Sequence, residues 1–118
     1  MDYVKNYWPY ALIFTFFAYK FWRTQQVKKA LPALKARGAF LLDVRAPMEF
    51  NSGHAVGCKN IPLGELSARM SEIPRGVPII VCCASGTRSG MAKALLARHG
   101  FNDVHNAGPW TTLQTKTE

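Results

Sequence analysis

Acidic residues and cysteines are both scarce in this sequence. Its 118 residues include seven Asp and Glu against 15 Lys and Arg, a net charge of +8. There are three cysteines, and two of them, Cys82 and Cys83, are adjacent. An odd number with adjacent members argues against a framework of structural disulfides and fits a reducing compartment. Without a C-x-x-C pair, and with neighbouring cysteines that cannot comfortably bind one ion, the sequence indicates no metal site.

Aromatic residues are sparse after residue 29, where four of the 14 occur. Nine others lie within residues 7–22, where 13 of 16 residues are apolar and the exceptions, Pro9, Thr15 and Lys20, form no polar stripe. As a helix, this segment would measure roughly 24 Å against roughly 30 Å of bilayer hydrocarbon. Tyrosine and tryptophan at both ends, and a lysine able to reach the headgroups, predict a single membrane-spanning helix. The alternatives are an interfacial helix, a signal peptide and a buried core helix.

The positive charge is divided evenly at residue 29. Residues 1–29 carry five basic residues and one acidic residue, and residues 30–118 carry ten and six, so each part has a net charge of +4. One lysine precedes residues 7–22 and four basic residues lie at or beyond their far end, which predicts that the C-terminal part faces the cytoplasm. Half of the charge thus flanks the membrane segment, and we expect no nucleic-acid partner. The expected organisation is an N-terminal membrane anchor with a basic juxtamembrane segment over 1–29 and one domain over 30–118.

Strand and helix patterns alternate through residues 30–118. Apolar runs predict strands at residues 39–44 and 79–82, and two further short strands are expected at residues 58–61 and 101–106. Helical patterns predict helices at residues 30–37, 47–50, 64–70 and 89–99. Pro32 should restrict the first helix to a start near Ala30, and Gly100 is expected to cap the last one in a left-handed conformation. Alternation with short connections favours an α/β domain built on a parallel sheet.

The loop that follows the most strand-like run, residues 79–82, carries the candidate chemistry. It begins at Cys83 and ends at Arg88, directly before a predicted helix. Ligands of parallel sheets bind beyond the carboxyl ends of the strands, and the N–H groups of a helix N-terminus favour an anion there. A cysteine at this point is expected to have a lowered pKa and to act as a nucleophile without a general base. Strand alternation directs Cys82 into the packing, so Cys83 is the predicted nucleophile.

Several fragments of residues 30–112 resemble the rhodanese family of sulfurtransferases in their order and spacing. They are Leu41 to Arg45, Glu49-Phe50, Gly53-His54, Asn60 to Leu63, the loop from Cys83 to Arg88 with Ser89-Gly90, and Gly100-Phe101 with Gly108. The resemblance implies a rhodanese-like five-stranded parallel sheet flanked by helices, and a Cys83 that carries sulfur as a persulfide. In one departure from the family, Ala84 stands where many relatives carry arginine.

The reaction that the resemblance implies needs no cofactor. The Cys83 thiolate attacks the outer sulfur of a small anionic donor such as thiosulfate, and sulfite leaves. A thiol or cyanide then removes the sulfur from the persulfide in a ping-pong cycle. Backbone N–H groups of the loop are expected to hold the donor and the persulfide. These residues are Ala84, Ser85, Gly86, Thr87 and Ser89.

Four further residues have predicted roles around the loop. Arg88 either attracts the anionic donor or braces the loop, and Asp43 supports the loop from the neighbouring strand end. Arg45 and Glu49 lie four residues apart and predict a structural ion pair. Cys58 would be a resolving thiol if it approached Cys83.

Two other functions fit parts of the pattern. Counting from Cys82 gives C-x5-R up to Arg88, the spacing of cysteine phosphatases and arsenate reductases, some of which share the rhodanese fold. The absence of a preceding histidine and the strand position of Cys82 disfavour this reading. The second alternative is a non-catalytic, membrane-tethered adaptor, which an intact nucleophile in an intact loop disfavours. The oligomeric state does not follow from the sequence.

Overall fold

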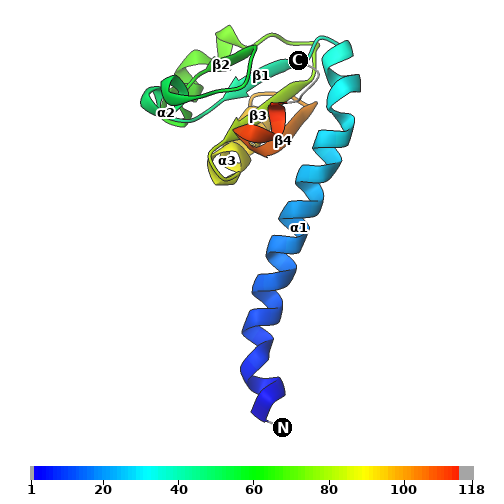
Figure 1. Ribbon diagram of the computed structural model, residues 1–118. Helices are drawn as coiled ribbons and strands as arrows, with labels where there is room; N and C mark the ends of the chain where they lie inside the picture. Colours follow the sequence, from blue (N-terminus) through cyan, green and yellow to red (C-terminus); the bar gives the residue numbers. More distant parts are fainter. Residues whose placement is uncertain (1, 115–118) are drawn as a thin grey trace.

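A long N-terminal helix leads into a small α/β domain, as Figure 1 shows for the computed structural model, which describes residues 2–114. Helix α1 (Asp2–Ala36) is continuous across residue 29 and contains both Pro9 and Pro32. The predicted start near Ala30 is therefore wrong. Leu31 and Leu34, on either side of Pro32, are both buried against the domain, and this burial offsets the backbone hydrogen bond that proline removes.

The predicted transmembrane helix is not supported. Over the described residues, no part of α1 combines the length and the apolar character needed to cross a bilayer. Its apolar stretch is short for a span, and Lys20 lies within it.

Four parallel strands form one sheet in the order β2-β1-β3-β4. They are β1 (Phe40–Asp43), β2 (Cys58–Asn60), β3 (Ile79–Cys83) and β4 (Val104–Pro109). The predicted parallel α/β fold is confirmed, whereas the five strands implied by the resemblance are not found among the described residues. The described chain before β1 is helical from Asp2 to Ala36.

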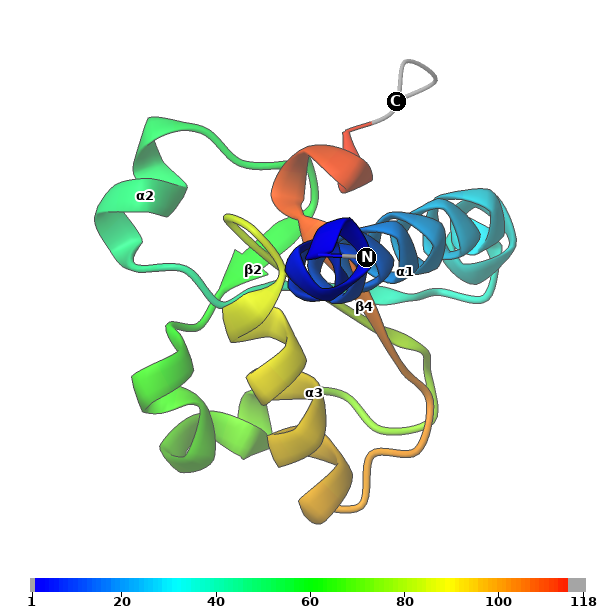
Figure 2. The same cartoon turned by 90° about the horizontal axis from the view of Figure 1, so that it is seen from below.

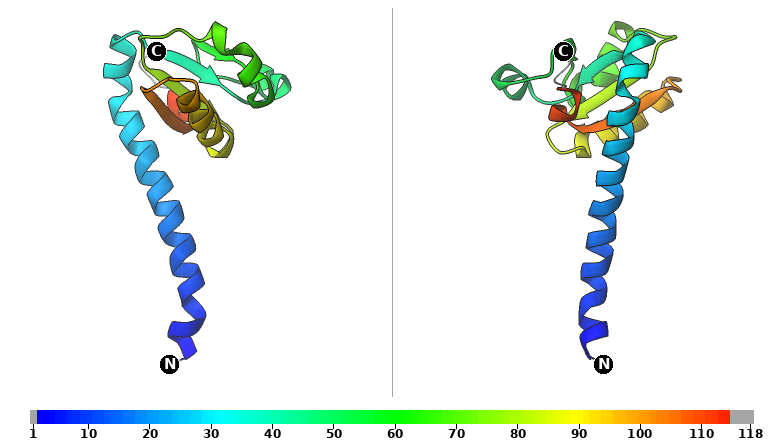
Figure 3. Two further views of the ribbon diagram at one scale, coloured as in Figure 1. Left: turned by 180° about the vertical axis from the view of Figure 1, so that it is seen from behind. Right: turned by 45° about the vertical axis from the view of Figure 1, so that its right-hand side comes forward.

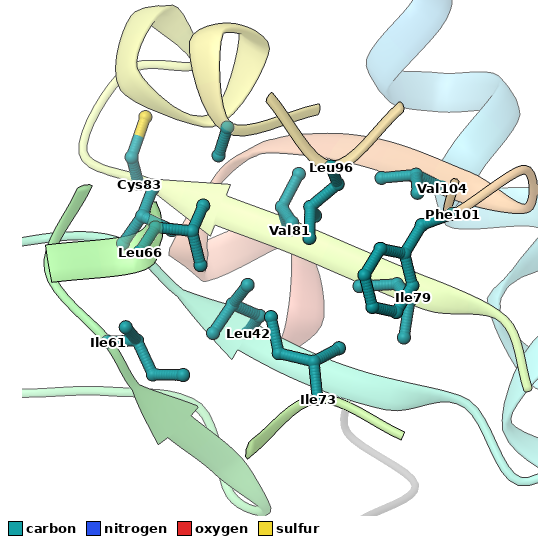
Figure 4. Packing of buried hydrophobic residues seen from close by; sticks show 12 residues of the cluster. Leu42, Ile61, Leu66, Ile73, Ile79, Val81, Cys83, Leu96, Phe101 and Val104 are labelled. Carbon is teal, nitrogen blue, oxygen red and sulfur yellow. The ribbon is translucent and has the colours of Figure 1, made fainter. Parts of the chain in front are cut away.

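Each face of the sheet carries its own apolar core. On one face, Leu42, Val81 and Cys83 pack with residues of α3 (Thr87–Arg98) and of a 3-10 helix, η1 (Leu63–Glu72), as Figure 4 shows. On the other face, residues of α1 and of a second 3-10 helix, η2 (Trp110–Leu113), cover the sheet. The short helix α2 (Pro47–Ser52) has no fully buried residue. Figure 3 shows α1 crossing the domain on the side away from α3.

Contact between α1 and the domain begins at Lys20. Residues 6–19 are exposed, whereas Lys20, Thr24 and Val27 are half-buried, and Leu31 and Leu34 are buried. Steps of three and four residues place these five side chains on one helical face. Helix α1 thus has an exposed aromatic half and a half that packs on the sheet.

Candidate active site

Cys83 ends β3 and lies at the beginning of the loop that leads into α3. Its side chain is on the α3 side of the sheet, and Figure 4 shows the sulfur beyond the end of the strand. The Sγ atom accepts a hydrogen bond from the Gly86 N–H at 2.9 Å and lies 3.4 Å from Ser89 Oγ. The predicted nucleophile is therefore buried and surrounded by donors at a helix N-terminus.

Gly86 makes the tight loop possible. Its φ of +102° lies in the left-handed region that side chains disfavour. A Cβ atom at this position would also lie 3.3 Å from the Gly108 Cα, so the loop and β4 approach closely at two glycines. This conformation directs the Gly86 N–H at the thiol and starts α3 at Thr87.

Two opposing effects set the pKa of Cys83. Burial raises the pKa, while hydrogen bonds from the Ser89 side chain and from the backbone N–H groups of Ser89, Gly86 and Ser85 lower it, and the net shift is downward. The Ser89 hydroxyl lies 2.6 Å from Asn106 Oδ1, the acceptor available while Cys83 is protonated. When Cys83 loses its proton, the hydroxyl can donate to the thiolate instead. The lowered pKa favours the reactive form of the sulfur.

Replacing Ser89 with alanine is expected to raise the pKa of Cys83, because the thiolate loses its hydroxyl donor while the backbone donors remain. The midpoint of the pH profile for iodoacetamide alkylation should move to higher pH. Alkylation at pH 7 should slow about threefold or more. Ser85→Ala is the matched control, since that residue contributes its N–H rather than its side chain. Equal midpoints in Ser89→Ala and the parent would contradict this assignment.

Cys82 and Cys58 lie on the opposite face of the sheet from Cys83. Contact with Cys58 and burial raise the pKa of Cys82, which stays a neutral thiol. Cys58 lies on β2 and Cys83 on β3, with β1 between the two strands. Two strand spacings together measure roughly 9–10 Å, which exceeds the Cα separation that a disulfide spans. Cys58 therefore does not approach Cys83 as a resolving thiol. A phosphatase loop built on Cys82 would have to use a thiol of raised pKa on the face of the sheet opposite Cys83.

Arg88 forms an ion pair with Glu49 across the site. Its guanidinium donates to the two carboxylate oxygens at 2.6 and 2.9 Å. Hydrogen bonds from Arg88 and from the Ala46 N–H lower the pKa of Glu49 to about 2, so the carboxylate is ionised at neutral pH. Of the two roles predicted for Arg88, this geometry supports bracing the loop. The predicted pairing of Arg45 with Glu49 is wrong, because Glu49 faces Arg88 instead.

Arg45 pairs with Asp43, which is fully buried. The guanidinium donates to the Asp43 carboxylate at 2.8 to 3.0 Å and to the Gly53 carbonyl at 2.6 Å, and it stacks over the Trp110 ring. The carboxylate bonds to Arg45 and not to the loop, which corrects the predicted loop-supporting role of Asp43. The pair ties the end of β1 to the segment after α2.

The remaining predicted loop residues differ in exposure. Ala84, Ser85 and Thr87 are exposed, whereas Gly86 and Ser89 are buried beside the thiol. Sequence reasoning missed Asn106, which accepts from the Ser89 hydroxyl and from the Gly108 N–H. Its position in a strand, β4, that ends at the same sheet edge was the available signal.

A model of the family described as "Rhodanese-like domain" matches residues 24–107. The chain is 36% identical over 86 residues to the uncharacterized protein YqhL of Bacillus subtilis, a match covering 70% of this chain and 68% of that protein. It is 38% identical over 69 residues to the thiosulfate sulfurtransferase PspE of Escherichia coli, covering 57% of this chain and 66% of that protein. The chain thus spans about two thirds of each of these relatives.

A solved structure described as a rhodanese with anions, from E. coli, is similar in fold. It superposes with a TM-score of 0.59 at 34% identity, over 63% of this chain and 89% of that one. The family match, residues 24–107, includes β1, β2, β3, the loop that begins at Cys83, and α3.

Proposed function

The chain belongs to the rhodanese-like domain family, and on that premise we propose that it is a sulfurtransferase in which Cys83 carries sulfur as a persulfide. One observation carries the proposal: a buried thiol of lowered pKa accepts the Gly86 N–H at the start of α3. Fixed N–H dipoles favour a negative sulfur at this point without a metal or an organic cofactor. Relatives named thiosulfate sulfurtransferases support the same activity.

The proposed reaction has two steps. The Cys83 thiolate attacks the outer sulfur of thiosulfate, a new S–S bond forms, and the S–S bond of the donor breaks to release sulfite with its electron pair. A thiolate or cyanide then attacks the outer sulfur of the persulfide, and Cys83 leaves as a thiolate. Sulfite thus leaves before the acceptor binds, which predicts ping-pong kinetics.

The experiment that tests the proposal is intact mass measurement of the wild-type protein after incubation with thiosulfate. We expect a gain of one sulfur atom, located by peptide mapping at Cys83 and removed by cyanide. No gain of sulfur, or sulfur located at Cys58 or Cys82, would refute the proposal. An unreactive protein would favour the adaptor alternative, and turnover of a phosphate ester would favour the phosphatase.

Location is a separate proposal: we infer that the exposed aromatic half of α1 binds to the surface of a lipid bilayer on its cytoplasmic side. Phe14 and Phe17 are 74% and 63% exposed, and they belong to a stretch, residues 6–19, that is exposed throughout. A contiguous exposed apolar surface of this kind marks an interaction site. Three basic residues, Arg23, Lys28 and Lys29, follow this segment, and the anionic lipids of the cytoplasmic leaflet attract such charges.

Vesicle flotation tests this location. The full chain is expected to float with vesicles containing anionic lipid, and a Phe14→Ser/Phe17→Ser double variant should float at least about threefold less. Met48→Ser is the control, because it removes an exposed apolar side chain from the domain and leaves α1 unchanged. Recovery of the wild-type chain in the lipid-free fraction would refute the proposal.

A further inference from the structure

The loop has no cation available for a donor. Thiosulfate carries two negative charges and must approach a thiolate, so the encounter needs positive charge nearby. Arg88 is the one cationic side chain from Cys83 to Arg88, and both of its donor contacts go to the ionised Glu49. The positive charge of Arg88 and the negative charge of Glu49 largely cancel, so the pair attracts an anionic donor only weakly.

Helix α1 brings another cation to the loop. A Cβ atom placed on Gly86 would lie 3.9 Å from both Cε and Nζ of Lys20. Because the N–H of the same glycine is bonded to Cys83, these contacts place the ammonium within about 10 Å of the sulfur. Figure 2 shows the loop between β3 and α3 beside α1.

The position of Lys20 is set by packing. Lys20 is half-buried, and its ammonium lies 5.4 Å from the centre of the Phe16 ring. One turn further along the same face, Thr24 Oγ1 lies 3.2 Å from where a Cβ on Gly108 would be. Gly86 in the loop and Gly108 in β4 therefore both face α1, and the helix packs directly beside the site.

No carboxylate pairs with Lys20 among the described side chains. Burial and the charge of Arg23 on α1 lower the pKa of Lys93 on α3, so two more basic groups lie near each other. Unpaired positive charge beside a nucleophile fits an anionic ligand.

We propose that Lys20 is a donor-binding residue, whose ammonium holds the anionic end of the sulfur donor while its outer sulfur meets Cys83. This inference rests on the proposed sulfur transfer and adds to it a residue that binds the anionic group of the donor. It also assigns a direct part in the site to α1, most of which lies before the residues that match the family.

Kinetics with thiosulfate and a thiol acceptor provide the first test. Lys20→Gln is expected to raise the KM for thiosulfate about 5-fold to 20-fold with little change in kcat, and Lys20→Arg should restore it. Lys28→Gln is the matched control, because it removes the same charge from an exposed position on α1. An unchanged KM in Lys20→Gln would overturn the proposal.

Alkylation of Cys83 provides a second test that does not depend on sulfur transfer. The ratio of its reaction rates with iodoacetate and iodoacetamide, followed by peptide mass, compares an anion with a neutral reagent of similar shape. This ratio should fall about threefold or more in Lys20→Gln and not in Lys28→Gln. If the wild-type protein accepts no sulfur yet the ratio falls, the proposed function fails while the cation site stands. An unchanged ratio would refute the site.

Discussion

Replacing Cys83 with serine is expected to reduce sulfur transfer from thiosulfate by at least about a thousandfold, because a serine hydroxyl is neither ionised at neutral pH nor able to carry a persulfide. The rest of the site should survive, since serine has nearly the same shape and Gly86 and Ser89 remain as its neighbours. The measurement is steady-state turnover, together with intact mass after exposure to thiosulfate.

Cys82→Ala is the matched control for this variant. Cys82 is adjacent in sequence and equally buried, but it packs on the other face of the sheet. We expect this variant to lose some stability and to retain activity within about threefold per folded molecule. The reverse pattern, with turnover lost in Cys82→Ala and kept in Cys83→Ser, would overturn the assigned nucleophile and revive the phosphatase reading.

Replacing Asp43 with alanine should lower the free energy of unfolding by about 3–5 kcal/mol, because it leaves the Arg45 guanidinium buried without its partner. The side chain of Asp43 is completely buried and that of Arg45 is 5% exposed. A guanidinium keeps its proton in proteins even when it is buried, so Arg45 cannot escape the unpaired charge by losing its proton. Unfolding by urea, followed by circular dichroism, measures the loss.

Glu65→Ala provides the comparison for a carboxylate in an exposed ion pair. Glu65 pairs with Arg69 at 3.2 Å on the surface of η1, where its side chain is 56% exposed. We expect a change of no more than about 0.5 kcal/mol there. Similar losses in the two variants, or a loss below about 1 kcal/mol in Asp43→Ala, would contradict the structural role of the buried pair.

The strands and the place of Cys83 at the start of the loop were within reach of sequence reasoning because each depends on local patterns. Runs of four to six residues predicted the four strands that the sheet contains, but not their order. The count of five came from the family resemblance and not from these runs. Strand alternation likewise separated Cys82 from Cys83, and the two thiols do lie on opposite faces.

Pairings between distant residues were out of reach. Glu49 was predicted to pair with Arg45 because the two are four residues apart, yet it forms its ion pair with Arg88, which is 39 residues away. Arg45 turns instead to Asp43, a residue two positions away at the end of the same strand. Charge and spacing alone do not rank such partners, since the choice depends on which carboxylate is buried when the sheet assembles.

The sequence by itself determined the parallel α/β fold, the loop from Cys83 to Arg88 and the aromatic character of residues 7–22, because hydrophobic periodicity and turn residues act over short distances. Tertiary structure alone decided that α1 continues through Pro32, that Arg88 is paired with Glu49, and that Lys20 lies against Gly86. The physical reason is that packing on the sheet outweighs the local cost of proline, and that packing brings together charges that no spacing in the chain relates.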